Sequence, residues 1–181
     1  YLMSQAVGRI LVQKGSGVIV NLSSESGLEG SEGQSCYAAT KAAMNSFTRS
    51  IDLLQREMDV TSLRYQVTAN NLANSEVPNF KRSTVNFESE LKKAFESEEI
   101  AKNSFHLTTT DSRHMQINTP IDYHTIEPRR VLDYTSTSKA NGNNVDAEYE
   151  ANNILQIQMQ YRMLTQLTSF EFDQVTTAMK K

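Results

Sequence analysis

The sequence predicts a mainly α-helical protein in which two long helices, over residues 46–73 and 146–179, pair as a helical hairpin or coiled coil. Three observations predict this fold. Apolar residues recur at helical spacing in both segments, the stretch 75–145 between them is polar and holds all three prolines, and residues 1–43 differ in composition from residues 44–181. We therefore expect a small, irregular, β-containing middle between the helices and a separate N-terminal α/β fragment.

Bulk properties exclude several classes of function. A net charge of −3 over 181 residues gives no reason to expect binding to nucleic acid or to an acidic membrane. No apolar run approaches the roughly 18 residues of a membrane span, and residues 1–15 lack the basic start of a signal peptide. Cys36 is the only cysteine, and the three histidines lack the i,i+4 spacing of a metal-binding helix. We expect no metal, no cofactor and no small-molecule substrate.

Residues 1–43 read as the beginning of an α/β unit. Six of the seven glycines lie in this segment, whereas all three prolines lie after it. The pattern predicts a helix over residues 1–15, a buried strand in GVIVNLSS, a glycine-rich loop in SESGLEGSEGQS and a second helix that begins at YAATKAAMNSF. A segment of this length is too short to build a doubly wound sheet.

This segment resembles the short-chain dehydrogenase/reductase family. The resemblance rests on NLSS, which ends at Ser24, followed by Tyr37-x-x-x-Lys41. In that family the tyrosine is the general acid/base, the lysine lowers the pKa of its phenol, and the serine orients the substrate oxygen. The glycine-rich turn that holds a dinucleotide pyrophosphate is missing. We therefore expect an inactive fragment with vestigial site residues, and the alternative is an NAD(P)-dependent reductase.

The helix over residues 46–73 carries a broad apolar stripe. The stripe begins with Phe47, Ile51, Leu54 and Met58. At 1.5 Å per residue this helix is roughly 42 Å long. Pro78 forbids its continuation, because proline has no backbone N–H and clashes with the preceding turn.

The helix over residues 146–179 carries two apolar stripes. Asn144 or Asp146 is its predicted N-cap, and acidic residues follow in the first turn, where the helix dipole favours them. One stripe comprises Ile154, Ile157, Tyr161, Leu164 and Val175, and we expect it to carry assembly together with the stripe of the first helix. The other comprises Leu155, Met159, Met163 and Phe170. Two stripes require more than one neighbour, so the chain is either a small bundle with a flexible insert or a subunit that completes its core against other subunits.

Between the helices, residues 75–145 are mostly irregular. FESELKKAFESEE predicts a short charged helix, whereas FHLTTT and VLDYTSTS predict short strands because their residues alternate or are β-branched. A polar stretch of this length is either functional or flexible.

Residues 69–82, ANNLANSEVPNFKR, resemble the signature of the flagellar rod and hook family, in which an Asn-x-Ala-Asn core leads to proline, an aromatic and a basic residue. The matching positions are Asn71, Ala73, Asn74, Pro78, Phe80 and Lys81. The family usually has threonine before the proline, where this chain has Val77. The tail GNNVDAEYEA matches as well, and the length from Met44 onward is that of a compact proximal rod protein, most similar to spirochaete versions.

The signature also has a physical use. Asparagine accepts left-handed backbone and bonds its own main chain, so it ends a helix sharply. Pro78 then fixes the exit, Phe80 supplies an apolar anchor, and Lys81 with Arg82 supplies a basic rim.

The rod resemblance implies a structural subunit of the bacterial flagellum rather than an enzyme. It implies self-assembly through the terminal helices, contact with other rod subunits and with the membrane-ring end of the basal body, and transmission of torque in motility. It also implies a place in the periplasmic rod, reached through the flagellar type III export channel without a cleaved signal peptide. The two resemblances meet between Lys41 and Ser50, because MNSFTRS fits both. A free-standing coiled-coil module is the second alternative.

Overall fold

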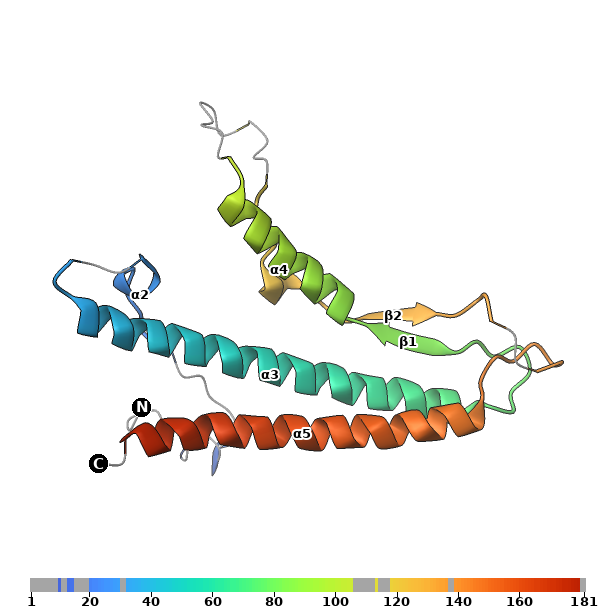
Figure 1. The fold of residues 1–181 in the computed structure, drawn as a ribbon. Helices are drawn as coiled ribbons and strands as arrows, with labels where there is room; N and C mark the ends of the chain where they lie inside the picture. The colour runs from blue at the N-terminus through green and yellow to red at the C-terminus, as the bar shows by residue number, and fades with distance from the viewer. Residues whose placement is uncertain are drawn as a thin grey trace. The chain divides into compact units, whose positions relative to one another are not determined.

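The computed structural model describes residues 10, 13–14, 20–29, 32–105, 113, 118–136 and 139–179. The chain forms two compact units, Tyr1–Leu53 and Leu54–Lys181, and the boundary between them lies inside helix α3 (Ser35–Ala73). Figure 1 labels the helices and strands along the chain. The described structure is mainly helical, as the sequence predicts, and most of the helix belongs to α3 and α5 (Ala147–Met179).

The N-terminal unit contains the four-residue helix α2 (Ser26–Glu29), which replaces part of the predicted glycine-rich loop, and the beginning of α3. Most of the helix predicted over residues 1–15 and the first part of the predicted strand lie outside the described residues. The rest of that strand is irregular, and Val20 and Leu22 are 81% and 82% exposed, so the prediction of a buried strand is wrong there. A buried parallel strand needs neighbouring strands to hydrogen-bond with, and the described part of this unit contains none.

Helix α3 begins at Ser35 and ends at Ala73. The helix predicted to begin at YAATKAAMNSF and the helix predicted over residues 46–73 are one continuous helix. Residues 38–43 include four alanines, which favour helix. The predicted end of this helix is confirmed. Gly27 of α2 lies close against it, since a Cβ atom on Gly27 would be 2.8 Å from the Lys41 carbonyl carbon.

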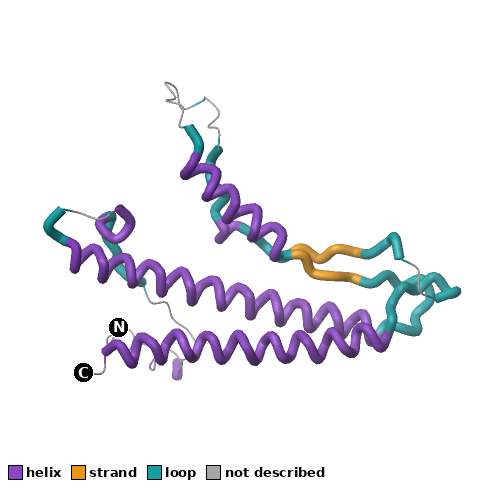
Figure 2. The backbone as a smooth tube through the Cα atoms, viewed as in Figure 1, coloured by secondary structure: helices purple, strands orange, loops and turns teal. Residues whose placement is uncertain are grey.

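In the C-terminal unit, α5 runs back beside residues 54–73 of α3 in the opposite direction (Figures 1 and 2). This is the predicted hairpin, and the helix predicted over residues 146–179 is confirmed except for its first residue. On α5, Ile157 is buried, and Ile154 and Leu164 on the same helix face are half-buried.

The polar middle contains a two-stranded antiparallel sheet and one longer helix. Strand β1 (Ser83–Asn86) pairs with β2 (Arg129–Leu132). Helix α4 (Glu88–Asn103) follows β1, as FESELKKAFESEE predicts, and the 3-10 helix η1 (Tyr123–Thr125) packs against it. The small sheet thus places α4 and η1 as one arm of the unit (Figure 1).

The two predicted strands of the middle had different outcomes. VLDYTSTS contributes only its first two residues to β2, which begins at Arg129. Of FHLTTT, Phe105 is irregular and residues 106–110 lie outside the described part of the chain. Strand β1 was not predicted, because STVN is short and its strand state depends on pairing with β2.

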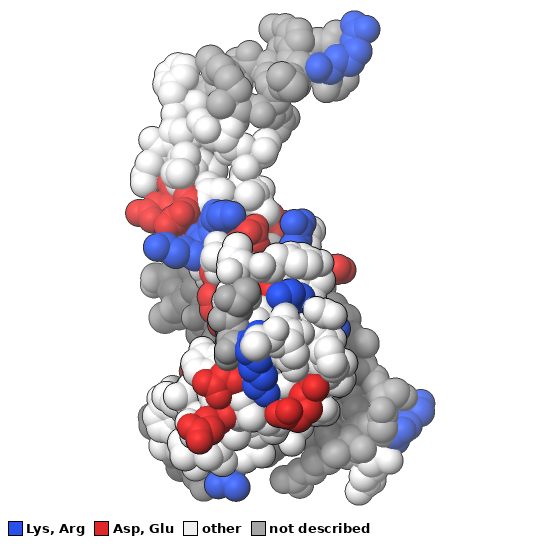
Figure 3. Space-filling model, turned by 90° about the vertical axis from the view of Figure 1, so that its right-hand side faces the viewer, with Lys and Arg blue, Asp and Glu red and all other residues white. Residues whose placement is uncertain are grey.

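The C-terminal unit has a small core in which polar residues are as prominent as apolar ones. The buried apolar residues are Val60, Val67, Phe87, Ala94, Ala101, Val145 and Ile157. The buried polar residues are Thr61, Thr68, Asn71, Ser83, Asn143, Asn144 and Glu150. On the face seen in Figure 3, basic and acidic side chains lie intermingled at the surface. A buried polar group costs free energy unless it is hydrogen-bonded. The hydrogen bonds of the buried polar residues therefore show which parts of the unit are held in a specific geometry.

Candidate functional site

Asn71, a residue of the predicted signature, joins the end of α3 to strand β1. Its side chain is 1% exposed. The amide nitrogen Nδ2 donates to the Ser83 carbonyl oxygen at 2.8 Å, and Oδ1 accepts from the Ser83 backbone nitrogen at 3.0 Å. A single carboxamide thus satisfies both main-chain groups of a strand residue, as a neighbouring strand would. This contact fixes the position of β1 on the helix.

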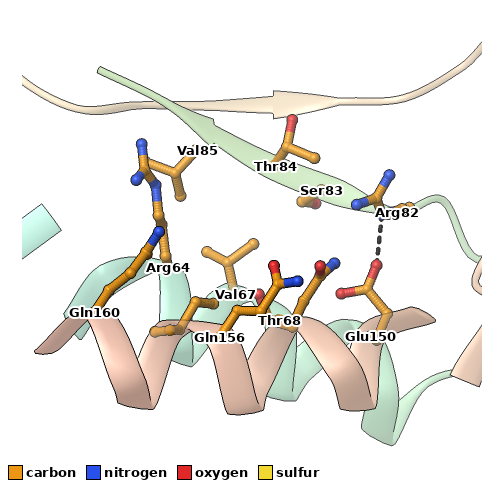
Figure 4. Close-up of a pocket in the computed structure, with 12 residues that line it drawn as sticks. Arg64, Val67, Thr68, Arg82, Ser83, Thr84, Val85, Glu150, Gln156 and Gln160 are labelled. Carbon is orange, nitrogen blue, oxygen red and sulfur yellow. Dashed lines mark hydrogen bonds and ion pairs between the residues drawn. The ribbon is translucent and has the colours of Figure 1, made fainter. Parts of the chain in front are cut away.

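Glu150, in the first turn of α5, is a charged residue that is only 1% exposed. Its Oε1 accepts from Nε of Arg82 at 2.5 Å (Figure 4). Its Oε2 accepts from Nδ2 of Asn71 at 3.4 Å. The Arg82 guanidinium also lies 4.7 Å from the centre of the Tyr149 ring. Burial alone lowers the pKa of Arg82, but the hydrogen bond and charge of Glu150 outweigh it and hold this pKa above its ordinary value. One carboxylate therefore joins α3, α5 and the chain leading into β1.

Asn143 provides hydrogen bonds to the backbone carbonyl groups of the turn after α3. Its side chain is completely buried. Nδ2 lies 2.9, 3.0 and 2.8 Å from the carbonyl oxygens of Asn74, Ser75 and Val77, and Oδ1 accepts from the Val145 backbone nitrogen at 2.7 Å. These carbonyl groups lie past the helix end, where the helix itself supplies no donor. The sequence pattern did not predict this role, although Asn143 lies within the tail GNNVDAEYEA.

Asn144 and Asp146 were alternative N-caps of the last helix, and the structure gives them different roles. Asp146 is the N-cap, since its Oδ1 accepts from the Glu148 backbone nitrogen at 3.0 Å. Asn144 accepts from the Arg82 backbone nitrogen at 2.6 Å and donates to the Asp133 carbonyl oxygen at 2.8 Å. Arg82 directly precedes β1 and Asp133 directly follows β2, so Asn144 connects the segment before α5 to one end of the two-stranded sheet.

Two lysines complete these contacts. Nζ of Lys81 donates to the Gly142 carbonyl oxygen at 2.9 Å, and Nζ of Lys139 donates to the Ser75 carbonyl oxygen at 2.8 Å. Lys81 was expected at a basic rim, but here it binds the chain itself. We call the connected buried or partly buried residues the polar clasp, which consists of Asn71, Arg82, Ser83, Asn143, Asn144 and Glu150.

The other signature residues form the exit from α3. Ala73 is the last helical residue, and Nδ2 of Asn74 donates to the Asn70 carbonyl oxygen at 2.8 Å. Pro78 is exposed and Phe80 is half-buried. The sequence also predicts an asparagine with left-handed backbone in this stretch, and it lies between Pro78 and Phe80.

That position is Asn79, whose φ is 60°. Its backbone nitrogen donates to the Asn141 carbonyl oxygen at 3.1 Å. Gly142, with φ of 79°, approaches so closely that a Cβ atom there would be 2.6 Å from Oδ1 of Asn79. The turn after α3 and the turn before α5 thus pack directly against each other.

A polar cavity of about 190 Å³ lies beside the clasp, between the hairpin and β1 (Figure 4). Arg64, Thr68, Gln156 and Gln160 contribute to its lining. The Ser83 hydroxyl is buried there and has no hydrogen-bond partner within the described part of the chain. This size and polarity suit ordered water, whereas organic ligands need larger and more apolar pockets.

The two stripes of α5 have different surroundings. In the first, Ile157 is buried and Tyr161 is 44% exposed. In the second, the exposed fractions are 54% for Leu155, 68% for Met159, 62% for Met163 and 56% for Phe170. We call these four residues the outer stripe.

The stripe predicted on α3 is half-buried throughout. Leu54 and Met58 lie in the C-terminal unit, and Phe47 and Ile51 lie in the N-terminal unit. The surfaces predicted to carry assembly were this stripe of α3 and the first stripe of α5, and the outer stripe is more exposed than either.

The dehydrogenase-like residues are only partly brought together. Tyr37 and Lys41 lie one turn apart on α3, and Nζ of Lys41 is 5.7 Å from the Tyr37 ring centre. The same Nζ donates to the Leu22 carbonyl oxygen at 2.7 Å, and the Ser24 hydroxyl oxygen accepts from the Ser26 backbone nitrogen at 3.4 Å. Within the described residues, no hydrogen bond connects Ser24 to Tyr37 or Lys41.

Metal-binding clusters and membrane-spanning helices are both absent from the part of the chain that the structure describes. It contains no group of three His, Cys, Asp or Glu side chains placed to hold a metal ion. None of its helices has the length and apolar character needed to cross a membrane.

A hairpin of long helices, closed by a polar clasp and open along one apolar face, defines a structural, assembly-type protein. Flagellar basal body rod protein FlgB of Borreliella burgdorferi is 42% identical over 137 residues, which span 76% of this chain and 100% of that protein. FlgB of Borrelia hermsii is 40% identical over the same length and with the same coverage. The chain belongs to the FlgB family of flagellar basal body rod proteins.

The N-terminal part is similar to a different family. The short chain dehydrogenase family matches residues 1–79. Sorbitol-6-phosphate 2-dehydrogenase of Klebsiella pneumoniae is 78% identical over 50 residues, which span 28% of this chain but only 19% of that enzyme. The dehydrogenase similarity therefore covers an N-terminal fragment. Because a match to residues 1–79 and a match of 137 residues together exceed the 181 residues of the chain, the two similarities overlap.

Proposed function

We propose that the chain is a structural subunit of the proximal rod of the flagellar basal body, that it polymerises through its terminal helices, and that the polymer transmits torque in motility. The main support is the outer stripe, which is apolar yet exposed. Exposed apolar faces of this extent mark interaction sites, because a soluble monomer gains nothing from displaying them.

The charge distribution of α5 supports the same function. Residues 151–170 contain one charged residue, Arg162. A helix face that stays in water usually carries many charges, whereas the centre of a protein interface is depleted of them. The outer face of α5 thus has the composition of a surface that another chain covers.

The partners in this proposal are further copies of the chain, other rod subunits and the membrane-ring end of the basal body. The subunit reaches the periplasmic rod by flagellar type III export without a cleaved signal peptide. The names of the FlgB relatives and the similarity over their full length support this assignment. Contacts that continue from copy to copy without closing produce such a filament.

Residues 1–43 are, in this proposal, a dehydrogenase-derived segment joined to the rod protein between Lys41 and Ser50. The overlap of the two similarities and the continuity of α3 through this stretch support a join inside one helix. Lys41 already binds the Leu22 carbonyl oxygen, which opposes a catalytic role for it. A fluorescence titration with NADH tests this point: we expect no saturable binding, and saturable binding would establish the reductase instead.

Motility tests the rod function. A chain that begins at Met44 should restore swimming to a cell that lacks its own proximal rod subunit. The full 181-residue chain should restore less, because the additional segment extends the helix that must pack in the rod. Failure of the shorter chain, at normal levels of secretion, contradicts the rod function. Equal swimming with both chains shows that the N-terminal segment does not hinder assembly.

Sedimentation distinguishes the rod subunit from a free-standing coiled-coil module. The module forms one discrete dimer or tetramer at low concentration, whereas the rod subunit forms a series of oligomers that lengthens with concentration. A single closed oligomer at all concentrations contradicts the proposal.

A further inference from the structure

A groove runs between the two helices of the hairpin and is separate from the polar cavity beside the clasp. We call it the hairpin groove, and it is lined by Thr61, Ser62, Tyr65, Ile157, Gln158, Tyr161 and Arg162. Its volume is about 420 Å³. Tyr65 on α3 and Tyr161 on α5 are 42% and 44% exposed, so their rings offer apolar surface that the chain itself leaves uncovered.

The outer stripe cannot fill the groove of its own chain. Successive residues of an α-helix are about 100° apart around its axis, so Met159 lies about 200° around α5 from Ile157. Ile157 lines the groove, whereas Met159 does not. Arg162, which also lines the groove, lies about 60° around α5 from Met159, so the outer stripe lies on the helix face next to the groove. Leu155 and Met163 share the direction of Met159, because residues four apart lie on one helix face.

We propose that the outer stripe of one copy inserts into the hairpin groove of a second copy of this chain. This inference rests on the proposed rod function and names the surfaces that carry it. Each copy presents its stripe and its groove on different parts of its surface, and a contact that uses one stripe and one groove is heterologous. A copy bound through its stripe still offers an empty stripe-binding groove to the next copy, and the assembly stays open at both ends.

The outer stripe and the hairpin groove are chemically complementary. The groove is lined by hydroxyl, amide, aromatic and aliphatic groups, and Arg162 at its edge is its one charged lining residue among those described. The outer stripe is uncharged and contains Met159 and Met163, whose flexible thioether side chains adapt to irregular space and pack well on aromatic rings. The groove volume of about 420 Å³ leaves room for several such side chains.

Charged substitutions on each surface provide the test, and all of them fall at exposed positions. Met159→Asp blocks the stripe, and Ser62→Arg blocks the groove. The matched controls place the same charges elsewhere on the same helices: Gln160→Asp, which faces the polar cavity, and Gln66→Arg, which does not line the groove. Each is made in the full chain, and circular dichroism confirms that its helix content equals that of the parent.

Sedimentation velocity then gives the outcome. The parent and both controls should form open-ended oligomers, and each blocked variant alone should remain monomeric. An equimolar mixture of Met159→Asp and Ser62→Arg should form a 1:1 dimer and nothing larger, because it contains one intact stripe and one intact groove per pair. A mixture that stays monomeric, or a blocked variant that polymerises like the parent, overturns this pairing and leaves the rod function intact. A parent chain that stays monomeric at every concentration overturns both.

Discussion

The polar clasp and the outer stripe reverse the usual distribution of polar and apolar side chains. At the clasp, Asn143 and Glu150 are buried and hydrogen-bonded, whereas along α5 Met159 and Met163 are exposed. The difference teaches how a small unit can be ordered without a large core. Hydrogen bonds at the hairpin end hold its internal geometry. In the proposed function, the exposed apolar area of the outer stripe is the surface that contacts other copies.

The largest effect is expected from Asn143→Ala. The change removes the donor to three turn carbonyls and the acceptor for the Val145 nitrogen, which leaves buried groups unsatisfied. The free energy of unfolding should fall by about 3 kcal/mol. Urea denaturation measures it. Asn152→Ala, at an exposed asparagine of α5, is the control and should cost no more than about 0.5 kcal/mol. Equal effects of both changes would show that the clasp does not order the unit.

Glu150→Ala should have the next largest effect. It leaves the Arg82 guanidinium, whose side chain is 22% exposed, without its carboxylate, and it removes one acceptor from Asn71. Because Arg82 keeps some contact with water, the expected loss is about 2 kcal/mol, below that of a fully buried pair. Thermal unfolding measures this loss, and Glu148→Ala, at an exposed acid in the same helix turn, is the control. Both changes remove a charge that interacts with the helix dipole, so the difference between them gives the effect of the buried Arg82–Glu150 pair.

A pair of alanine substitutions compares the two stripes of α5 directly. Ile157→Ala removes a buried side chain and should lower the free energy of unfolding of the monomer by about 2 kcal/mol. Met163→Ala removes an exposed one and should change it by less than about 0.5 kcal/mol while weakening assembly. If both changes destabilise the monomer equally, the outer stripe is already covered within the chain.

The smallest effect concerns a carboxylate beside the clasp. Hydrogen bonds from the Ser136 side chain and backbone, together with Thr135, lower the pKa of Asp133 to about 2. A lowered pKa means that this stabilisation is fully present above the ordinary value of 3.8 and is lost as the pH falls through about 2. NMR titration of the carboxyl carbon should show this midpoint, and Ser136→Ala should move it upward. An unchanged midpoint in Ser136→Ala would assign the shift to another cause.

Much of the hairpin could be predicted because its signals are local. Helical spacing, Pro78 and an acidic first turn located the C-terminal end of α3 and both ends of α5 to within one residue. The spacing of Leu155, Met159 and Met163 indicated a second apolar face. Each of these signals depends on residues close together in sequence.

The clasp could be predicted only in part. Asn71 was identified, but the partners of Asn143 and Glu150 come from segments far apart in the chain. In the sequence alone, Asn143 is typical of a turn and Glu150 is typical of the first turn of a helix. The buried strand predicted in GVIVNLSS failed for the opposite reason. Its apolar run is typical of a parallel strand, but a strand also needs neighbours that this segment does not supply among its described residues.

Methionine oxidation tests most directly whether the outer face of α5 is open until another copy covers it. The rates of sulfoxide formation at Met159 and Met163 are compared with that at Met58, which is half-buried in the same hairpin, by mass spectrometry of dissociated and assembled chains. We expect Met159 and Met163 to oxidise several-fold faster than Met58 in the dissociated chain and to become protected on assembly. Slow oxidation of both in the dissociated chain, or unchanged fast oxidation after assembly, would contradict this account.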